Sequence, residues 1–491
     1  MTTLVVVNHP RDWPFEISGM RIVTAREYLT DPAYSENQSA RVLNLCRTER
    51  YQGRGYYVSL LAEARGHRPL PEVKTLGDLQ SSEPPDRLLP ANFGESLQRA
   101  LASNGESTFT LDAFFGRDPE RQNDALAQQL FAVLRIPMLR AHFDRPHGRW
   151  RLRDLRILGV FDVQPGERPF IADSAREYMA RSTRPRAKPP ASGKASIAIL
   201  YDDDEPEPPS NPAAIDKLCA AARDLGMRAS IIGRDDIDRL PQFDGLFIRD
   251  TTNVNHYTYQ FARRAAAEGL VVIDDPESIL RCTNKVYLNE LLSRHQVSVP
   301  RTVVVDREGA AARIEASLGF PCIVKEPDGA FSLGVEKVEG RAALEAVLAK
   351  YFERSALVLA QEWLPTSFDW RVGVLDGRPL FVCKYMMAPG HWQVVKRERG
   401  RKLEGATLAM PVGEAPEPVV RAAVRAATLI GDGLYGVDLK QVGDRCYVIE
   451  VNDNPNIDAG NEDSVLGEAL YREVLGVFLR RIRDPASRAA A

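Results

Sequence analysis

Apolar and polar positions near the C-terminus alternate in two short runs, which together predict a β-hairpin. The runs Leu434–Val442 and Cys446–Val451 predict two strands, and residues 443–445 predict the turn between them. Antiparallel pairing around residue 444 places Asp438 opposite Glu450, with both side chains on one face and roughly 5 Å apart. The pattern therefore predicts two carboxylates that face each other across a two-stranded ribbon.

From residue 195 onward the apolar pattern predicts two kinds of fold in succession. Up to residue 283, buried strands alternate with helices, which is typical of a small parallel α/β domain. The predicted elements are the strands Ala195–Leu200, Ala229–Ile232 and Gly245–Ile248 and the helices Ala213–Leu225 and Tyr257–Ala267. After residue 284 the pattern indicates an α+β region with antiparallel hairpins. Its predicted elements include the strands Thr302–Val305, Cys322–Lys325 and Leu380–Met386 and the helices Ala310–Leu318 and Val465–Arg480.

The N-terminal part predicts a further globular domain, which begins with the strand Leu4–Val7 and contains a helical run, Tyr57–Ala64. Prolines at 185, 189 and 190 then interrupt regular structure and indicate a linker. The fold class predicted is thus α/β combined with α+β. The predicted divisions are a domain at 1–181, a linker at 182–194, a parallel α/β domain at 195–283, an α+β domain at 284–483 and a flexible tail at 484–491.

Composition narrows the classes of partner. With 64 basic and 67 acidic residues among 491, the net charge of −3 provides no global field that attracts nucleic acid or an anionic membrane. No run of 18 apolar residues and no signal-peptide pattern occur, so we expect a cytoplasmic protein without a membrane span. The six cysteines lack CxxC spacing, which argues against a zinc knuckle. The acidic run Asp202–Glu207 is interpreted as a solvated loop.

The predicted hairpin has the composition of a cation site. Asn452 follows Glu450 by two residues and therefore shares the face of the two carboxylates. Closely spaced carboxylates repel unless a cation or a proton intervenes. Three oxygen donors suit Mg²⁺, which keeps waters and phosphate oxygens as its other ligands. The alternative is a solvated hairpin in which Lys440 is the local counter-charge.

Two lysines are candidates for phosphate binding. Lys285 opens a helical run, and Lys325 ends an apolar strand just before a loop that contains Gly329 and Gly334. Lysine at the end of a buried strand, beside a loop rich in backbone N–H donors, is well placed to meet phosphate oxygens. Taken singly, each lysine is more often a surface charge. The loop between Asp328 and Gly334 is also the predicted lid over the site.

A third motif predicts a nucleobase contact. The strand Leu357–Gln361 runs into Glu362 and Trp363. Backbone groups and an aromatic ring at such a strand end can meet adenine, and the carboxylate is available to ribose hydroxyls. Asp369 and Arg371 follow shortly afterwards.

The order of these motifs resembles the ATP-grasp superfamily, and within it the RimK-type ligases that join an amino acid to a carboxylate. The resemblance covers Ile197–Arg480, and its strongest part is Gly436-Val437-Asp438 followed at twelve residues by Glu450-Val451-Asn452. It implies an ATP-grasp fold for 284–483 and a pre-ATP-grasp domain before it. The opening segment around Asn8 and His9 resembles an additional N-terminal domain of one RimK-like subgroup.

This resemblance assigns expected roles to individual residues. It implies that Asp438, Glu450 and Asn452 bind two Mg²⁺ ions, for which Mn²⁺ substitutes, and that the nucleotide is ATP. The implied nucleotide contacts are Lys285, Lys325, Glu362, Trp363, Asp369, Gly329 and Gly334. Lys384 is expected to be a further phosphoryl contact, and Arg371 and Arg249 are candidates for the substrate carboxylate or the oxyanion. His391 is a candidate proton acceptor.

The function implied is that of an ATP-dependent carboxylate-amine ligase. Such an enzyme forms an amide through an acyl phosphate, releases ADP and phosphate, and here adds an amino acid such as glutamate to an amino acid or peptide. Its expected partners are small-molecule or peptide carboxylates and amines, and a homo-oligomer is expected. Two alternatives remain: a kinase of a small hydroxyl substrate that uses the same cleft, and a nucleotide-sensing interaction protein.

Overall fold

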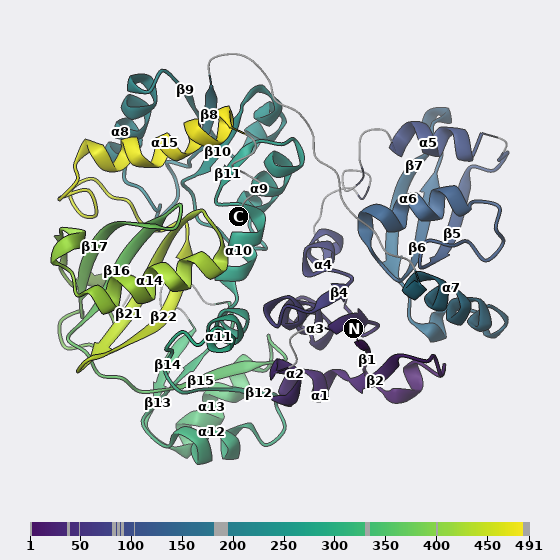
Figure 1. Ribbon diagram of the computed structural model, residues 1–491, viewed down its shortest axis with the longest axis horizontal. Helices are drawn as coiled ribbons and strands as arrows, with labels where there is room; N and C mark the ends of the chain where they lie inside the picture. The colour runs from purple at the N-terminus through teal and green to yellow at the C-terminus, as the bar shows by residue number, and fades with distance from the viewer. Residues whose placement is uncertain are drawn as a thin grey trace. The chain divides into compact units, whose positions relative to one another are not determined.

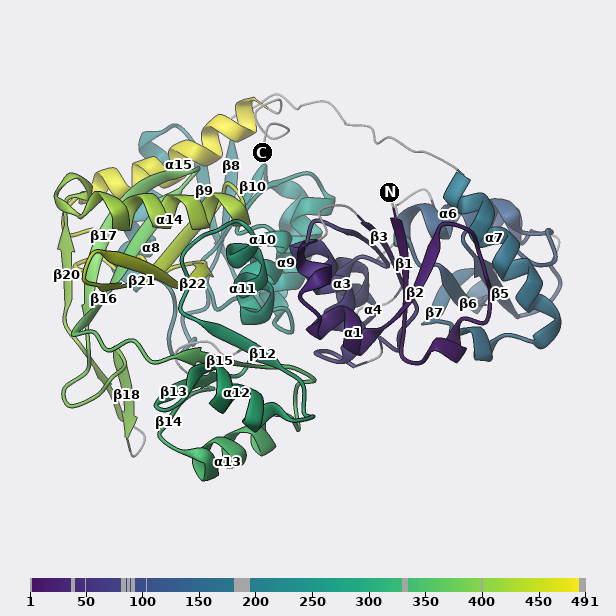
Figure 2. The same ribbon diagram turned by 60° about the horizontal axis from the view of Figure 1, so that its bottom comes forward.

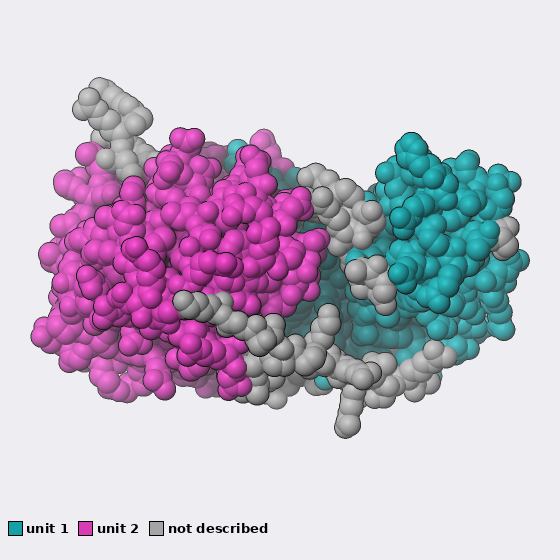
Figure 3. Space-filling view, turned by 90° about the horizontal axis from the view of Figure 1, so that it is seen from above, with its two compact units in different colours: residues 1–186, 354–356 teal, residues 187–353, 357–491 magenta. Residues whose placement is uncertain are grey.

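The computed structural model (Figure 1) describes residues 2–36, 40–48, 50–80, 85, 89, 93–102, 104–180, 195–328, 334–398 and 401–484. The chain forms two compact units, coloured separately in Figure 3. Unit 1 comprises Met1–Arg186 with Arg354–Ala356, and unit 2 comprises Ala187–Glu353 with Leu357–Ala491. The predicted linker 182–194 and the tail after Asp484 lie outside the described residues. The boundary between 283 and 284 falls inside unit 2 and stays a prediction.

Unit 1 begins with a parallel sheet of strand order β2-β1-β3-β4. Its strands are β1 (Thr2–Val7), β2 (Met20–Thr24), β3 (Ala40–Asn44) and β4 (Arg68–Leu70), and its helices are α1 (Ala25–Thr30), α2 (Ala33–Glu36), α3 (Arg54–Ala64) and α4 (Val73–Gln80). The side chains of Val5, Val7 and Leu43 are fully buried and belong to one cluster with Trp13 and Leu70. The predicted strand at Leu4 and the helix at Tyr57 are confirmed, and both begin two or three residues earlier.

The sequence pattern does not predict the second sheet of unit 1, which is antiparallel with the order β5-β6-β7. Its elements are β5 (Thr108–Phe114), β6 (Met138–Asp144) and β7 (Arg151–Ile157), with helices α5 (Phe93–Ala100), α6 (Asp124–Leu134) and α7 (Arg168–Ala180). Arg140 pairs with Asp112 at 2.6 Å across two of these strands. Charged cross-strand pairs of this kind interrupt the apolar signal, and the alternation is therefore hard to recognise in the sequence.

Unit 2 begins with the predicted parallel α/β arrangement, a sheet of order β11-β10-β8-β9. Its strands are β8 (Ser196–Leu200), β9 (Arg228–Ile232), β10 (Gly245–Ile248) and β11 (Val271–Ile273), and its helices are α8 (Pro212–Asp224), α9 (Tyr257–Ala267) and α10 (Pro276–Thr283). The strands are apolar on both faces because helices cover the sheet. The predicted bounds of β10 and α9 are confirmed.

A second sheet of unit 2 is antiparallel with the order β12-β15-β13-β14. It consists of β12 (Thr302–Val305), β13 (Cys322–Lys325), β14 (Val335–Val338) and β15 (Val358–Glu362), with helices α11 (Lys285–Arg294), α12 (Ala310–Leu318) and α13 (Arg341–Tyr351). Ile314, Leu344 and Val358 belong to one buried cluster, so α12 and α13 pack on this sheet.

The third sheet of unit 2 is also antiparallel and has the order β20-β17-β16-β21-β22. Its strands are β16 (Phe368–Leu375), β17 (Arg378–Met386), β20 (Thr407–Met410), β21 (Leu434–Val442) and β22 (Arg445–Asp453). A separate two-stranded ribbon consists of β18 (Val395–Glu398) and β19 (Arg401–Glu404). The helices of this region are α14 (Glu417–Ile430) and α15 (Glu468–Arg483). Figure 2 shows the long α14 and α15 beside this sheet. The predicted fold class, with parallel and antiparallel sheets in one chain, is confirmed.

Helix α15 connects the first and third sheets of unit 2 through a shared core. Phe478 packs edge-on against Phe247 of β10, with ring centroids 5.5 Å apart. Phe381 of β17 belongs to the same buried cluster. Burying these large side chains together fixes the parallel sheet relative to the five-stranded sheet. Among the described residues, no helix is long and apolar enough to cross a membrane.

A substitution at Gly373 tests how tightly this core is packed. A Cβ atom at Gly373 would lie 2.3 Å from Cε1 of Phe381, its cross-strand neighbour. We expect Gly373→Ala to lower the free energy of unfolding by about 1–3 kcal/mol, because overpacking forces the ring out of place. In contrast, Gly476→Ala in α15 meets no atom within 4 Å and should stabilise the helix by about 0.5–1 kcal/mol. Urea unfolding measures both, and equal midpoints for the two variants would contradict the packing described.

Candidate functional site

A cavity of about 900 Å³ lies in unit 2, where the second and third sheets and the loops of the first sheet meet. Its lining includes nine residues that the sequence motifs predict for the site: Lys285, Lys325, Glu362, Trp363, Asp369, Arg371, Asp438, Glu450 and Asn452. These side chains come from β13, β15, β16, β21, β22 and the start of α11. The fold therefore assembles in one place residues that are up to 167 positions apart, from 285 to 452.

The hairpin β21–β22 pairs Asp438 with Glu450, as predicted. Its turn is shorter than predicted, since Val442 pairs with Arg445, and a register shift between Asp438 and Leu439 compensates for the difference. Asp438 is the cross-strand partner of Glu450, and Gly436 is the partner of Asn452. The amide nitrogen of Asn452 donates hydrogen bonds to the Gly436 carbonyl at 3.2 Å and to Oδ2 of Asp438 at 3.1 Å. Asp438, Glu450 and Asn452 thus present their oxygen-bearing side chains to the same cavity.

Arg371 on the neighbouring strand β16 binds Asp438. Its Nε and Nη2 donate to the two carboxylate oxygens at 2.5 and 2.9 Å, a bidentate pair. Gly436 leaves room for this arginine, because a Cβ at that position would lie 3.1 Å from both Cδ and Nη1 of Arg371. Burial lowers the pKa of Arg371, but the pairing with Asp438 more than offsets this and raises it. Burial also raises the pKa of Asp438 in spite of the guanidinium.

Two lysines face Glu450. The ammonium of Lys285 lies 2.8 Å from Oε1 of Glu450, and both Lys285 and Lys325 are only 7% exposed. Burial lowers the pKa of Lys325 to about 8, an effect that Glu450 opposes and Lys285 reinforces. Burial raises the pKa of Glu450, but the two ammonium groups outweigh it, and the pKa lies below its ordinary value.

The start of α11 holds Lys285 in this position. Asn284 caps the helix, since its side-chain oxygen accepts hydrogen bonds from the backbone N–H of Val286 and Tyr287, both at 3.1 Å. The backbone N–H of Lys285 donates to the Pro327 carbonyl at 2.8 Å. This bond ties the helix to the chain that follows Lys325, so the two lysines are positioned together.

Lys440 belongs to the site, although the sequence indicated it only as a counter-charge to the hairpin. Its ammonium lies 2.6 Å from Oδ1 of Asp369 and donates to the hydroxyl of Thr366 at 2.8 Å. Lys440 follows Asp438 by two residues on β21, and both line the cavity. Because side chains alternate between the two faces of a strand, the sequence could have placed Lys440 on the same face as Asp438.

Glu362 and Trp363, the residues predicted to contact a nucleobase, line the cavity, and both already contact other side chains of the protein. The carboxylate of Glu362 accepts hydrogen bonds from the backbone N–H and Nε of Arg301, both at 2.8 Å. The ring of Trp363 packs edge-on against Trp392, with centroids 5.3 Å apart. The ammonium of Lys337 lies 4.7 Å from the centroid of the Trp363 ring. The ring is thereby fixed from two sides, whereas the roles of both residues toward a nucleotide stay predictions.

The predicted glycine loop is described only at its ends. Gly329 lies outside the described residues, as does most of the predicted lid between Asp328 and Gly334. Gly334 has a φ of +70°, a backbone conformation that favours glycine. A Cβ at this position would also lie 2.8 Å from the carboxylate of Glu326. Glycine is therefore required here by the local backbone.

Two predicted catalytic residues do not line the cavity. Arg249 is 0% exposed, and its guanidinium donates to Ser210 Oγ at 3.0 Å, to Asn454 Oδ1 at 2.7 Å, to the Pro455 carbonyl at 2.9 Å and to the Pro209 carbonyl. It connects loops of the fold and, in this position, contacts no cavity space.

Lys384 is the second such residue. Its ammonium lies 4.9 Å from the ring centroids of both Phe368 and Trp370. The adjacent Tyr385 lines the cavity, and successive residues of a strand point to opposite faces. The geometry therefore places Lys384 on the other face of β17, so this position does not support a phosphoryl contact.

Several cavity residues carry no recognisable motif. They are Tyr385 on strand β17 and the loop residues Asn211, Asp458, Asn461 and Glu462. The hydroxyl of Tyr385 donates to Oε1 of Glu462 at 2.7 Å, and the guanidinium of Arg371 lies 5.0 Å from the Tyr385 ring centroid. Only the high density of polar residues after Pro455 could have indicated this part of the site.

Sequence profiles match two segments of the chain. The profile of the RimK-like ATP-grasp domain matches residues 282–467, and that of the RimK-like ATP-grasp N-terminal domain matches residues 25–174. The chain is a RimK-like ATP-grasp protein. The family predicted from the motifs is thus confirmed.

Curated relatives of this RimK-like protein carry ligase names. The "Probable alpha-L-glutamate ligase 1" of Shewanella denitrificans is 27% identical over 253 residues, which are 51% of this chain and 81% of that protein. The protein of the same name in Shewanella amazonensis is 27% identical over 265 residues, 53% of this chain and 83% of the relative. The D-alanine–D-alanine ligase of Bacillus anthracis in complex with ATP is 17% identical, with a TM-score of 0.47 over 60% of this chain and 99% of that one.

The donor set at the hairpin fits a magnesium ion. Asp438 and Glu450 offer carboxylate oxygens, and Asn452 offers its side-chain carbonyl oxygen. Proteins usually bind Mg²⁺ through one or two carboxylates, while waters and phosphate oxygens complete its coordination. No group of three or more His, Cys, Asp or Glu side chains suited to a metal occurs in the described part of the chain. Two carboxylates and an amide make a smaller set of protein ligands, which would leave positions on the ion for the oxygens of a nucleotide.

The lowered pKa of Lys325 should make the stability of the RimK-like protein depend on pH. The pKa of Lys325 is about 8 in the folded protein, against about 10.4 in an unfolded chain. Between these values the unfolded state binds more protons, so the contribution of Lys325 to the free energy of unfolding rises with pH across this window. The urea midpoint of wild type should therefore increase relative to that of Lys325→Met between pH 8 and pH 10. Lys350→Met, an exposed lysine variant, serves as control, and a flat difference for Lys325→Met would contradict the buried ammonium.

Proposed function

We propose that this protein is an ATP-dependent carboxylate-amine ligase that forms an amide bond through an acyl phosphate and releases ADP and phosphate. The observation that carries the proposal is the convergence of Lys285, Lys325 and the Asp438–Glu450 pair on one cavity. Membership in the RimK-like ATP-grasp family supports it, as do the ligase names of the relatives. By analogy with those names, an amino acid such as glutamate is one candidate substrate.

The cationic wall of the cavity suits a triphosphate. ATP carries about four negative charges near neutral pH, and attack by a carboxylate on the γ-phosphorus must overcome that charge. Lys285 and Lys325 are buried on the wall near Glu450 and would bind phosphate oxygens, with Lys440 close by. Magnesium held by Asp438, Glu450 and Asn452 would neutralise charge that accumulates on the leaving ADP.

Ion pairs prepare the site in the absence of nucleotide. Two partly buried carboxylates on facing strands repel each other. Arg371 offsets the charge of Asp438, and Lys285 offsets that of Glu450. The two carboxylates would thereby stay ionised and available to a metal ion.

Arg371 is the group best placed for the carboxylate substrate. It reaches the cavity between Asp438 and the ring of Tyr385. A guanidinium there would orient the substrate carboxylate and stabilise the oxyanion that forms when the amine attacks the acyl phosphate. The amine enters with its own proton, which must leave before the amide is complete.

Product analysis tests the proposal directly. Pooled amino acids and peptides are incubated with ATP and Mg²⁺, and the products are analysed by mass spectrometry together with an assay of ADP and phosphate. An amide product with equimolar ADP and phosphate supports the ligase. A phosphorylated hydroxyl product without free phosphate identifies the kinase instead, and absence of ATP consumption indicates a nucleotide-sensing protein.

The variant Glu450→Gln tests whether the carboxylate of Glu450 binds the metal ion. The substitution preserves size but removes a carboxylate, so ATP turnover should fall at least about 100-fold, whereas circular dichroism and the thermal midpoint should stay near wild type. Direct binding of Mn²⁺, followed by electron paramagnetic resonance, should weaken in parallel. Glu414→Gln makes the same chemical change at an exposed position of the short helix Val412–Glu414 and should leave both measurements unchanged. Near-normal turnover in Glu450→Gln would count against the assignment.

A further inference from the structure

The cavity has an uneven distribution of charge. Its lysine and arginine side chains, namely Lys285, Lys325, Arg371 and Lys440, all surround the hairpin β21–β22. Another part of the wall consists of the loops 206–211, 251–253 and 454–462, and none of these loops contains lysine, arginine or histidine. Residues 392–395 and 404–407 line the cavity as well. The cavity therefore has a cationic half around the hairpin and an acidic half formed by these three loops.

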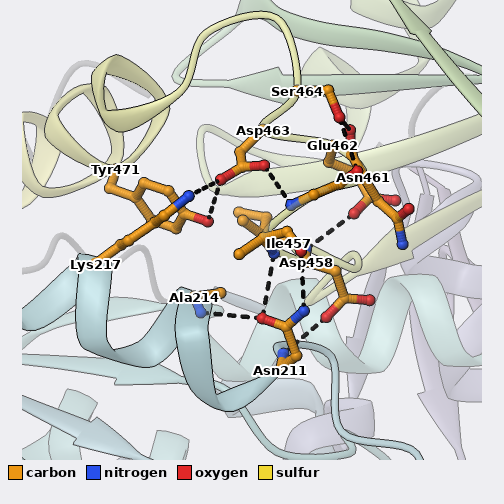
Figure 4. A network of polar contacts seen from close by, with 12 residues as sticks. Asn211, Ala214, Lys217, Ile457, Asp458, Asn461, Glu462, Asp463, Ser464 and Tyr471 are labelled. Carbon is orange, nitrogen blue, oxygen red and sulfur yellow. Dashed lines mark hydrogen bonds and ion pairs between the residues drawn. The ribbon is translucent and has the colours of Figure 1, made fainter.

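The loop 454–462 is fixed to helix α8, as Figure 4 shows. Oδ1 of Asp458 accepts a hydrogen bond from the backbone N–H of Asn211 at 2.7 Å. The Asn211 side chain donates to the Ala459 carbonyl at 3.1 Å and caps α8 by accepting from Ala214 N–H at 3.0 Å. Next to it, the ammonium of Lys217 lies 2.5 Å from Oδ2 of Asp463. The loop is therefore a rigid part of the cavity wall.

Two carboxylates of this loop face the cavity without an ion-pair partner among the described residues. Glu462 accepts from the backbone N–H of Asp458 at 2.9 Å and from Tyr385 at 2.7 Å, both neutral donors. The neighbouring cation, Arg249, donates to neutral acceptors of the loops instead. Burial raises the pKa of Asp458 and of Glu462, and repulsion from nearby carboxylates adds to it. A cation supplied by a ligand would relieve this repulsion.

We propose that the amine substrate is a cationic one, an amino acid or peptide with a basic side chain or a diamine, whose ammonium group is bound by Asp458 and Glu462. This inference rests on the proposed ligase function. The carboxylate substrate then occupies the half around Arg371, and Tyr385 marks the border, because its ring contacts Arg371 and its hydroxyl binds Glu462. A dicarboxylic amine such as glutamate would place its second carboxylate against the acidic half.

Competition among amines tests the proposal on the wild-type protein. Lysine, ornithine, 1,4-diaminobutane, glutamine and glutamate are supplied separately with ATP, Mg²⁺ and pooled carboxylates, and the amide product is quantified. Lysine, ornithine or the diamine should exceed glutamine in kcat/KM by about tenfold or more, and glutamate should be the poorest amine. Preference for glutamate would overturn the inference and leave the ligase function intact.

Charge-removing variants locate the contact. Asp458→Asn and Glu462→Gln should each raise KM for lysine about tenfold or more with a smaller change in kcat. Glu468→Gln, an exposed acid at the start of α15, is the matched control and should resemble wild type. Thermal unfolding verifies that each variant folds.

Binding without turnover separates this inference from the proposed function. Calorimetry measures the affinity of lysine for the protein in the presence of ADP and Mg²⁺. The affinity should fall with added salt, as an ionic contact requires, and should drop in Asp458→Asn. If no amide forms with any amine, the ligase function fails, and calorimetry still decides whether the acidic half binds a cation. Equal affinities for lysine and glutamate that do not change with salt would refute the binding of a cation by Asp458 and Glu462.

Discussion

The pairing of two partly buried carboxylates across one hairpin is the constraint on which this site depends. Asp438 and Glu450 face each other on β21 and β22, and such a pair is stable only with cations nearby. The fold supplies them from separate elements, Arg371 from the next strand and Lys285 from the start of α11. The second sheet then approaches the hairpin closely enough to bury Lys325 beside the same charges. The cavity and its cationic half follow from this arrangement.

Local patterns predicted these features because local rules determine them. The turn and the period-2 alternation locate the hairpin, so the sequence predicts the partnership of Asp438 and Glu450. The observed turn is two residues long rather than three, and a register shift between Asp438 and Leu439 restores that partnership. Lys325 ends an apolar run, and a charge at the end of a buried strand lies at the edge of the sheet. The strand and helix bounds in unit 2 were predictable for the same reason, since Pro, Gly and Asn punctuate them.

Residues whose orientation depends on distant chain segments were not predictable. Lys384 lies in a run that is apolar on both sides, so alternation gives no indication of which face it occupies, and pairing with β16 decides it. Arg249 follows a strand at the edge where ligands often bind, but loops around Pro209 and Pro455 engage all three nitrogens of its guanidinium. The sheet β5–β7 in unit 1 was missed because charged pairs obscure its alternation.

The buried Arg249 nevertheless explains how specificity can differ while the nucleotide half stays the same. It joins the loop before α8 to the loop after β22, and these two loops form the acidic half of the cavity. Sheet residues determine the charges around the hairpin, whereas loop residues, which tolerate substitution more readily, determine the charges opposite them. Under the proposed function, replacing loop carboxylates would change the preferred amine, while the buried arginine would keep the loops in place.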